Sequence, residues 1–194
     1  MPPGNRRMEK IRKVLSRRQP GLTVVMENIH DSHNVSAVLR SCDAAGVMRV
    51  ELLYTQEKFP RIGKKSSSSA SKWMERRNHT SVDECFATLH DEGFQIFATH
   101  LSENTVSLFD LDLTANVALV FGNEHRGVSE EAAAKADARV HIPMVGMIQS
   151  LNVSVAAAVC LYEAMRQRLN AGLYDRSGLA KDRYTSLFDD WCAR

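Results

Sequence analysis

The chain has 194 residues, of which 44% are hydrophobic and 25% charged, and its formal net charge is +2. This balance is typical of a globular protein with one sizeable core. No apolar run reaches the roughly 18 residues of a membrane span, and the N-terminus lacks the apolar block of a signal peptide. Membrane insertion and secretion are therefore disfavoured, and we expect a cytoplasmic protein.

Strands and helices are predicted to alternate along the chain. The predicted strands cover 22–28, 47–54, 94–101, 117–122 and 138–143. The predicted helices cover 5–18, 35–45, 81–93, 129–137, a long segment ending near Asn170 and part of the tail. Residues 55–78 lack a clear period, so we expect a loop or a segment that orders on binding. This alternation predicts an α/β fold with a mostly parallel sheet and helices on both faces.

Basic residues are concentrated in two segments. Residues 1–18 carry seven basic side chains against one acidic, and residues 58–77 do the same. Such segregation favours nucleic acid as a partner over two merely solvated surface segments. The expected organisation is a basic helix at 1–19, one α/β domain at 20–172 and a tail helix at 173–194. The candidate contacts to a nucleic acid are Arg6, Arg7, Lys10, Lys13, Arg17, Lys64, Lys65 and Lys72.

Unusual residues follow three of the predicted strands. These are Thr99-His100-Leu101, the segment "GNEHRG" at 122–127 and the loop that begins at Ile142. Ligands of open α/β sheets bind beyond the carboxyl ends of the strands, so we expect a site here. The glycine spacing fits neither a Rossmann fingerprint nor a P-loop. Backbone groups beside apolar side chains would instead suit a flat ligand such as an adenine ring.

The triplet Asn-Val-Ser occurs twice, at 34–36 and 152–154, each time next to a predicted helix. One interpretation is helix capping by Asn34 or Ser36 and by Ser150 or Asn152. Capping needs one polar residue per helix and does not account for the polar cluster at 149–152. The pair His30 and His33 could suggest a metal, but no set of acidic residues or cysteines completes such a site. The four cysteines are far apart and predict neither a disulfide nor a zinc site.

Three segments carry a resemblance to a known family: "ENIHDSHNVSAVLRSCDAAGV", "LVFGNEHRGVSEEA" and "IPMVGMIQSLNVSVAAAVCLYEAMRQR". They are similar to the three motifs of the TrmH (SpoU) family, the S-adenosylmethionine-dependent RNA 2′-O-ribose methyltransferases of the SPOUT superfamily. The resemblance covers roughly residues 10–175. The flanking segments resemble the branch that methylates guanosine 18 in the D-loop of tRNA.

The resemblance implies features that residue patterns do not supply. It implies a deep C-terminal trefoil knot, which departs from the general avoidance of knots, and a homodimer with tRNA as its partner. The polar cluster at 149–152 would belong to the cofactor loop, and the helix after it to the dimer interface. The family's functional polar positions match Asn34, Arg40, Glu124, Ser150 and Asn152. Contacts to S-adenosylmethionine, largely through backbone groups, would involve Thr99, Leu101, Gly122, Ile142, Met144 and Leu151.

The family assigns Arg40 a central role in activating the ribose hydroxyl, with Asn34 orienting it. A free guanidinium has a pKa above about 12, which makes it a poor base, and a nearby phosphate would favour its charged form. Two interpretations of Arg40 therefore compete: it acts as a base, or it acts as a clamp that fixes a phosphate and the ribose hydroxyl. We favour the clamp. The alternatives for the whole protein are a ribosomal RNA 2′-O-methyltransferase, a non-catalytic RNA-binding module and, more distantly, a metal-dependent enzyme.

Overall fold

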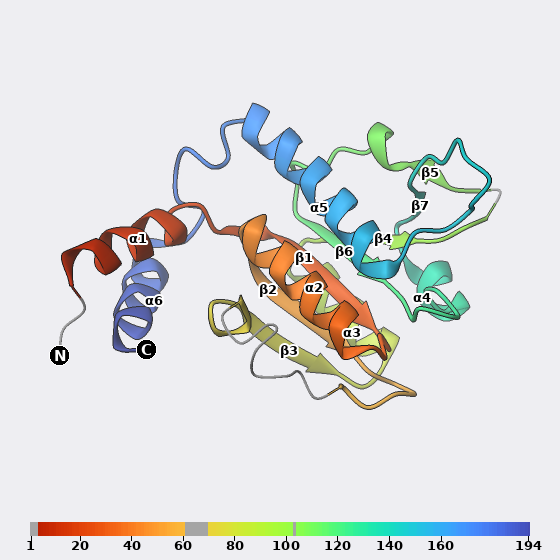
Figure 1. The fold of residues 1–194 in the computed structure, drawn as a ribbon, viewed down its shortest axis with the longest axis horizontal. Helices are drawn as coiled ribbons and strands as arrows, with labels where there is room; N and C mark the ends of the chain where they lie inside the picture. The colour runs from red at the N-terminus through yellow and green to blue at the C-terminus, as the bar shows by residue number, and fades with distance from the viewer. Residues whose placement is uncertain (1–3, 61–69, 103) are drawn as a thin grey trace.

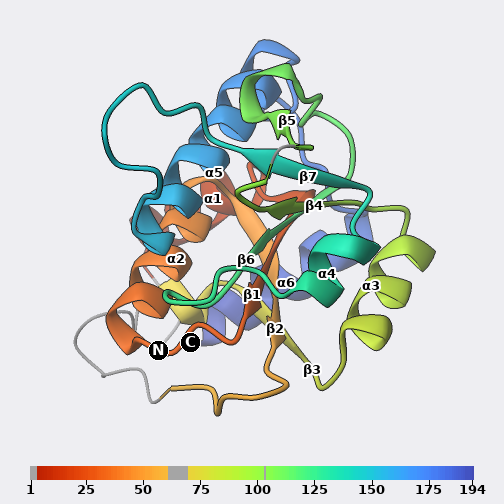
Figure 2. The same ribbon diagram turned by 90° about the vertical axis from the view of Figure 1, so that its right-hand side faces the viewer.

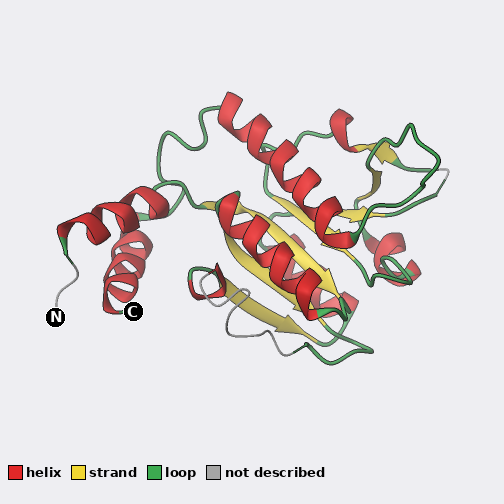
Figure 3. Ribbon diagram, in the orientation of Figure 1, coloured by secondary structure: helices red, strands yellow, loops and turns green. Residues whose placement is uncertain are grey.

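The computed structural model describes residues 4–60, 70–102 and 104–194. Its strands are β1 (Gln19–Glu27), β2 (Val47–Leu53), β3 (Glu75–His79), β4 (Gln95–Thr99), β5 (Val106–Ser107), β6 (Val117–Phe121) and β7 (Ala138–His141). In this part of the chain the strands form one sheet in the order β3-β2-β1-β6-β4-β7-β5, and every neighbouring pair is parallel (Figures 1 and 3). The predicted α/β fold is confirmed.

Helices cover both faces of the sheet. They are α1 (Asn5–Leu15), α2 (Ser32–Ala44), α3 (Val82–Asp91), α4 (Glu130–Lys135), α5 (Val153–Asn170) and α6 (Lys181–Ala193), with 3-10 turns η1 (Ala70–Lys72) and η2 (Leu108–Asp110). Helices α2 and α5 lie side by side on one face, and α3 and α4 lie on the other (Figure 2). Within the described residues, no helix has the length and apolar character needed to cross a membrane.

The main core lies between the sheet and the α2–α5 layer. Val35, Val38 and Leu39 of α2 are fully buried there, as are Cys160 and Leu161 of α5. A left-handed glycine, Gly46 with φ of +80°, follows the last turn of α2 and ends the helix as its position predicts. The packing of α2 against α5 brings the first turns of both helices to the same end of the sheet.

A buried arginine ties the far end of α5 to the sheet. Arg168 is 2% exposed, and its guanidinium donates hydrogen bonds to the carbonyl oxygens of Leu113 (2.9 Å) and Gly21 (2.8 Å). It also donates to Oε1 of Gln19 at 3.2 Å. These bonds join α5 to β1 and to the segment before β6, so that α5 has a fixed direction across the sheet.

The two termini pack on each other. Ile11 and Leu15 of α1 form a small separate core with Leu187 and Trp191 of α6, and the two helices lie side by side (Figure 1). Helix α1 ends at Leu15, three residues before the predicted end. The reason is Arg18, which is fully buried and pairs with Asp43, its Nη2 lying 2.5 Å from Oδ1.

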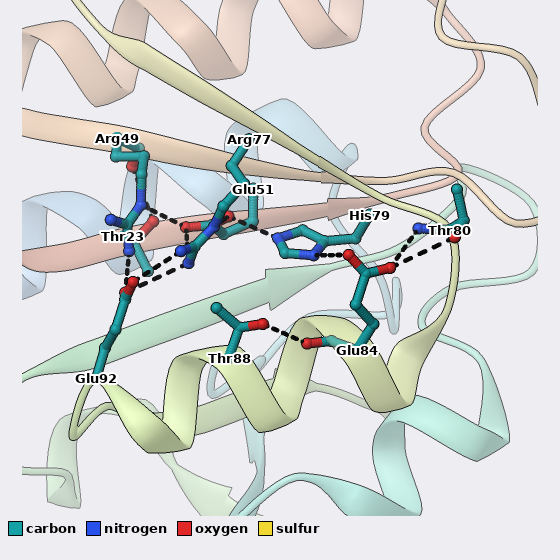
Figure 4. A network of polar contacts seen from close by, with 9 residues as sticks. All are labelled: Thr23, Arg49, Glu51, Arg77, His79, Thr80, Glu84, Thr88 and Glu92. Carbon is teal, nitrogen blue, oxygen red and sulfur yellow. Dashed lines mark hydrogen bonds and ion pairs between the residues drawn. The ribbon is translucent and has the colours of Figure 1, made fainter.

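Strand β3 begins within the segment 55–78, which we expected to be a loop or a segment that orders on binding, and the prediction of no strand was wrong for residues 75–78. The strand pairs with β2, but its residues are charged or polar, so the sequence shows no apolar alternation there. The fully buried Glu51 of β2 accepts hydrogen bonds from Arg77 (2.8 Å), Arg49 (2.7 Å) and His79 (2.8 Å) (Figure 4). Burial acts to raise the pKa of Glu51, but these bonds outweigh it and hold the pKa below its usual value.

Candidate active site

A cavity of about 460 Å³ lies at the carboxyl ends of β4, β6 and β7. Its walls come from the ends of those strands and from the loop between β7 and α5. This is the edge of the sheet where α/β proteins bind ligands, and the volume is that of a small-molecule site. All six residues expected to contact a cofactor line it: Thr99, Leu101, Gly122, Ile142, Met144 and Leu151.

The loop after β6 is built on close backbone contacts. The backbone groups of Asn123 and Gly127 exchange two hydrogen bonds, of 2.9 and 2.8 Å. A Cβ atom on Gly122 would lie 2.1 Å from the carbonyl of Gly127, so no larger residue fits there. Asn123 also donates from Nδ2 to the carbonyl oxygen of Asn28 at 2.8 Å. The loop is thereby held against the end of β1, and Glu124 has a defined place.

Glu124 is the centre of a polar network beside the cavity. Its carboxylate accepts hydrogen bonds from Nδ2 of Asn34 and from the backbone N–H groups of His30 and Asp31, each at 3.0 Å. Asn152 donates in turn from Nδ2 to Oδ1 of Asn34 at 3.1 Å. Burial acts to raise the pKa of Glu124, but the hydrogen bonds outweigh it and lower the pKa below the usual value.

The two Asn-Val-Ser triplets have different roles at their helices. Asp31 is the N-cap of α2, accepting from the N–H of His33 at 2.8 Å, so the capping interpretation of Asn34 and Ser36 was wrong. Asn152 does cap α5, because its Oδ1 accepts from the N–H of Ser154 at 2.9 Å. The carboxamide of Asn34 is therefore free to bridge Glu124 and Asn152.

Ser150 and Arg40 are placed differently. Ser150 lines the cavity, next to Gln149 and Asn152. Arg40 is exposed on α2 and does not line the cavity of its own chain. Among the described residues, no hydrogen bond or ion pair involves the Arg40 guanidinium. The structure thus brings together Asn34, Glu124, Ser150 and Asn152, but not Arg40.

Two histidines also lie in the cavity wall: His100 was part of a candidate segment in the sequence, but His141 was not singled out there. His100 follows β4 and His141 ends β7, and both line the cavity. Nδ1 of His141 is 2.9 Å from Oγ1 of Thr105. The position of His141 at the carboxyl end of a strand was the signal that could have identified it. In the described part of the chain, no cluster of three acidic, histidine or cysteine side chains could hold a metal ion.

The expected nucleic-acid contacts are only partly described. The exposed residues among them are Arg6, Arg7, Lys10, Lys13 and Arg17 on α1 or just after it, and Lys72 in η1. Lys64 and Lys65 lie outside the described residues. Arg18 and Arg77 contribute to the charge of the two basic segments, but both are engaged in ion pairs within the fold. The free basic surface is therefore smaller than the charge count indicates.

The parallel sheet has a cavity at its carboxyl edge, lined by a glycine-bearing loop and a polar helix start, which is the place where α/β proteins bind a ligand. Residues 21–162 match the model of the SpoU rRNA Methylase family, and the chain belongs to this family. Its members are S-adenosylmethionine-dependent RNA 2′-O-methyltransferases.

Similar proteins carry more specific names. The tRNA (guanosine(18)-2′-O)-methyltransferase of Thermus thermophilus is 48% identical over 185 residues, covering 95% of each chain. The enzyme of the same name from Escherichia coli K12 is 45% identical over 170 residues, 88% of this chain and 74% of that one. The TrmH/SpoU tRNA modifying enzyme of Aquifex aeolicus superposes with a TM-score of 0.90 at 37% identity, covering 97% and 95% of the two chains. The SpoU methyltransferase AviRb of Streptomyces viridochromogenes, whose structure contains AdoMet, has a TM-score of 0.69 at 28% identity, with coverages of 80% and 60%.

Proposed function

We propose that this chain transfers the methyl group of S-adenosylmethionine to the ribose 2′-hydroxyl of guanosine 18 in tRNA. The observation that carries the proposal is the chain of contacts from Glu124 through Asn34 to Asn152 beside the cavity. Relatives named for this reaction match nearly the whole chain, which supports guanosine 18 of tRNA as the target.

The cavity suits S-adenosylmethionine in shape and charge. Leu101, Ile142 and Leu151 supply apolar contacts for a flat adenine ring, and the ionised Glu124 provides a negative group next to the cavity for a cationic ligand. When bound, the cofactor supplies an electrophilic methyl group. The residues of this chain would hold the bound cofactor next to the acceptor hydroxyl, which is the kind of positioning that contributes many kcal/mol to catalysis.

Within this scheme the polar residues have separate tasks. Glu124 holds the amide of Asn34, so the Asn34 carboxamide cannot rotate freely. Asn152 fixes the other end of that carboxamide and the first turn of α5. Ser150, exposed in the cavity wall, is free to bind the ribose. Arg40 clamps an RNA phosphate and the 2′-hydroxyl through the N–H donors of its guanidinium.

We also propose that the chain acts as a homodimer. Helix α5 carries exposed apolar residues at intervals of seven, Val155, Tyr162 and Leu169, and the loop before it exposes Met147 completely. A surface of this kind is typical of a subunit interface. Because Arg40 does not line the cavity of its own chain, we propose that each site is completed by the Arg40 of the second copy.

The C-terminal knot is a further part of the proposal. The sheet order places β6 between β1 and β4, and β7 beyond β4, so the loops after β6 and β7 meet at one edge of the sheet around the cavity. This arrangement supports a chain path in which one loop passes through the other. Pulling the two termini apart by force tests it, because a knotted chain keeps a tightened knot and reaches a shorter final length than an unknotted chain.

Transfer of labelled methyl groups to RNA tests the reaction. We expect label from S-adenosylmethionine in an unmodified tRNA transcript, and nuclease mapping by mass spectrometry should locate 2′-O-methylguanosine in the D-loop. Label in ribosomal RNA alone would keep the chemistry and overturn the substrate. Cofactor binding without label in either RNA would contradict the proposed reaction.

A further inference from the structure

A second cavity, of about 200 Å³, lies between α6 and the segment that joins η1 to β3, and it shares no lining residue with the first cavity. In Figure 1 the α1–α6 pair and the loop between β7 and α5 lie at opposite ends of the long axis. The volume is below that of an ordinary cofactor or drug site, which is about 300 Å³ or more, and suits a single flat ring system. None of the residues of the proposed active site lines this cavity.

The walls combine aromatic and thioether side chains. Trp73 and Trp191 pack edge to face with ring centroids 5.0 Å apart, and both line the cavity with Met48 and Met74. Trp191 is 2% exposed, whereas Trp73 is only partly buried. Such a wall stacks well on a nucleobase, because every base has a flat π-face.

The rim carries two ion pairs that leave hydrogen-bonding capacity unused. Arg183 pairs with Glu75, and Nη2 of Arg194 lies 2.6 Å from Oδ2 of Asp190. Each carboxylate has two oxygens and each guanidinium five N–H donors, so one contact does not saturate either group. All four side chains are between 37% and 52% exposed, so a ligand can reach them.

This pattern of groups selects among bases. Guanine has adjacent N–H donors at N1 and N2, which a carboxylate can accept, and acceptors at O6 and N7, which a guanidinium can bind as a pair. Adenine and cytosine place an acceptor next to a single amino group and match a carboxylate less well. The exposed Lys72 directly precedes Trp73 of the cavity wall, and α1, which carries exposed basic residues, packs on α6. Basic groups on these elements suit contacts to the adjoining phosphates.

We infer that the cavity between Trp73, Trp191 and Asp190 binds a guanine base of the RNA substrate other than the one that is methylated. The inference rests on the proposed function for the identity of the ligand as RNA. It assigns the tail helix a direct part in choosing the substrate: Asp190 and Arg194 read the base, and Trp73 stacks on it.

Tryptophan fluorescence tests the inference directly, because the chain has only two tryptophans and both flank this cavity. We expect GMP to quench the fluorescence of the full chain with saturation, at lower concentrations than AMP or CMP. Asp190→Asn replaces one acceptor oxygen by a donor, so it should weaken GMP binding roughly tenfold. Asp189→Asn is the matched control, because Asp189 is exposed and does not line the cavity.

Methylation kinetics separate this inference from the proposed function. Asp190→Asn should raise the KM for a tRNA transcript roughly tenfold, while kcat and the KM for S-adenosylmethionine stay as in Asp189→Asn. If methyl transfer occurs but GMP does not quench the fluorescence, or if the two variants have equal KM for tRNA, the base-binding site is overturned and the proposed function stands. Quenching by GMP without methyl transfer to any RNA would support the site and overturn the proposed function.

Discussion

The side-chain amide of Asn152 donates to the side-chain oxygen of Asn34 across 3.1 Å, although 118 residues separate the two in the chain. Asn152 caps α5 with its oxygen and contacts Asn34 with its nitrogen, so one carboxamide serves both stability and the site. Two short triplets that look alike in the sequence therefore meet at one point of the fold, at the edge of the cofactor cavity.

Substitution of Asn152 separates its two roles. Asp is as good an N-cap as Asn, so Asn152→Asp should leave the free energy of unfolding nearly unchanged. It removes the donor to Asn34, and we expect kcat for methyl transfer to fall by about 10- to 100-fold. Asn152→Ala loses the cap as well and should also cost about 1 kcal/mol of stability. Thermal unfolding and single-turnover kinetics measure both effects. Equal activity of Asn152→Asp and wild type would contradict the role of the Asn34 contact.

Arg40→Ala tests the proposed clamp. Because Arg40 does not line the cofactor cavity, we expect unchanged affinity for S-adenosylmethionine and a loss of roughly 10²-fold or more in turnover. Calorimetry of cofactor binding and methyl transfer to tRNA provide the two measurements. Arg176→Ala, at another exposed arginine, is the control. Cofactor affinity that falls in parallel with turnover would refute this division of labour.

Mixed dimers test whether Arg40 acts across the subunit interface. Arg40→Ala and Glu124→Ala chains should each be inactive alone. If the arginine comes from the second copy, each mixed dimer contains one intact site, and mixing equal amounts after unfolding and refolding should restore about a quarter of the wild-type rate. If Arg40 serves its own chain, every site lacks one of the two groups and the mixture stays inactive.

The buried Glu51 predicts a defined loss of stability in acid. Its pKa is lowered in the folded protein, so its stabilisation is present above its unfolded pKa of about 4.3 and is lost as the pH falls through the folded value. Glu51→Gln should therefore reduce the free energy of unfolding by about 3 kcal/mol at pH 7, with a smaller difference from wild type below about pH 4. Urea unfolding across this pH range measures it, with the exposed Glu9→Gln as control. A difference that does not change with pH would refute the assignment.

The basic face of α1 predicts a salt-dependent affinity for RNA. Lys10 and Lys13 are exposed on that helix, and each phosphate contact adds roughly 0.7 to 0.9 to the slope of log affinity against log salt. Replacing both by Gln should lower the slope accordingly and weaken tRNA binding at low salt, without changing kcat at saturating RNA. Lys135→Gln removes an exposed lysine on α4 and should leave the slope unchanged. A slope that is the same in all three proteins would contradict RNA contact by α1.

Apolar periodicity was sufficient to predict the central strands and the helices that cover them. Strands such as β6, with every residue buried, show as continuous apolar runs. Strand β3 was missed because its stabilising partner is a carboxylate: Arg77 and His79 reach the buried Glu51, and pairing across 26 or 28 residues leaves no local period. Arg18 was counted with the basic surface for the same reason, since only the fold shows that it pairs with Asp43.

The candidate site was predictable in part. Glycines and polar residues after strands indicated the edge of the sheet where the cavity of about 460 Å³ lies, and the family resemblance supplied the individual residues. The start of α2 was misplaced because Asp31 and Asn34 are both residue types that cap helices well. Only the folded structure shows that Asp31 caps α2, whereas Asn34 donates to Glu124. The cavity beside Trp73 lies between the segment after η1 and helix α6, which are more than a hundred residues apart in the chain. No local sequence pattern indicates such a cavity.

We propose that the acceptor is the ribose hydroxyl of guanosine 18. Two synthetic tRNA molecules that differ at one atom test it most directly: one all-ribose, and one with 2′-deoxyguanosine at position 18. With labelled S-adenosylmethionine, we expect transfer to the first and none to the second, while both bind with similar affinity. Equal labelling of the two would rule out this acceptor, because the methyl group would then be placed on another atom or another nucleotide.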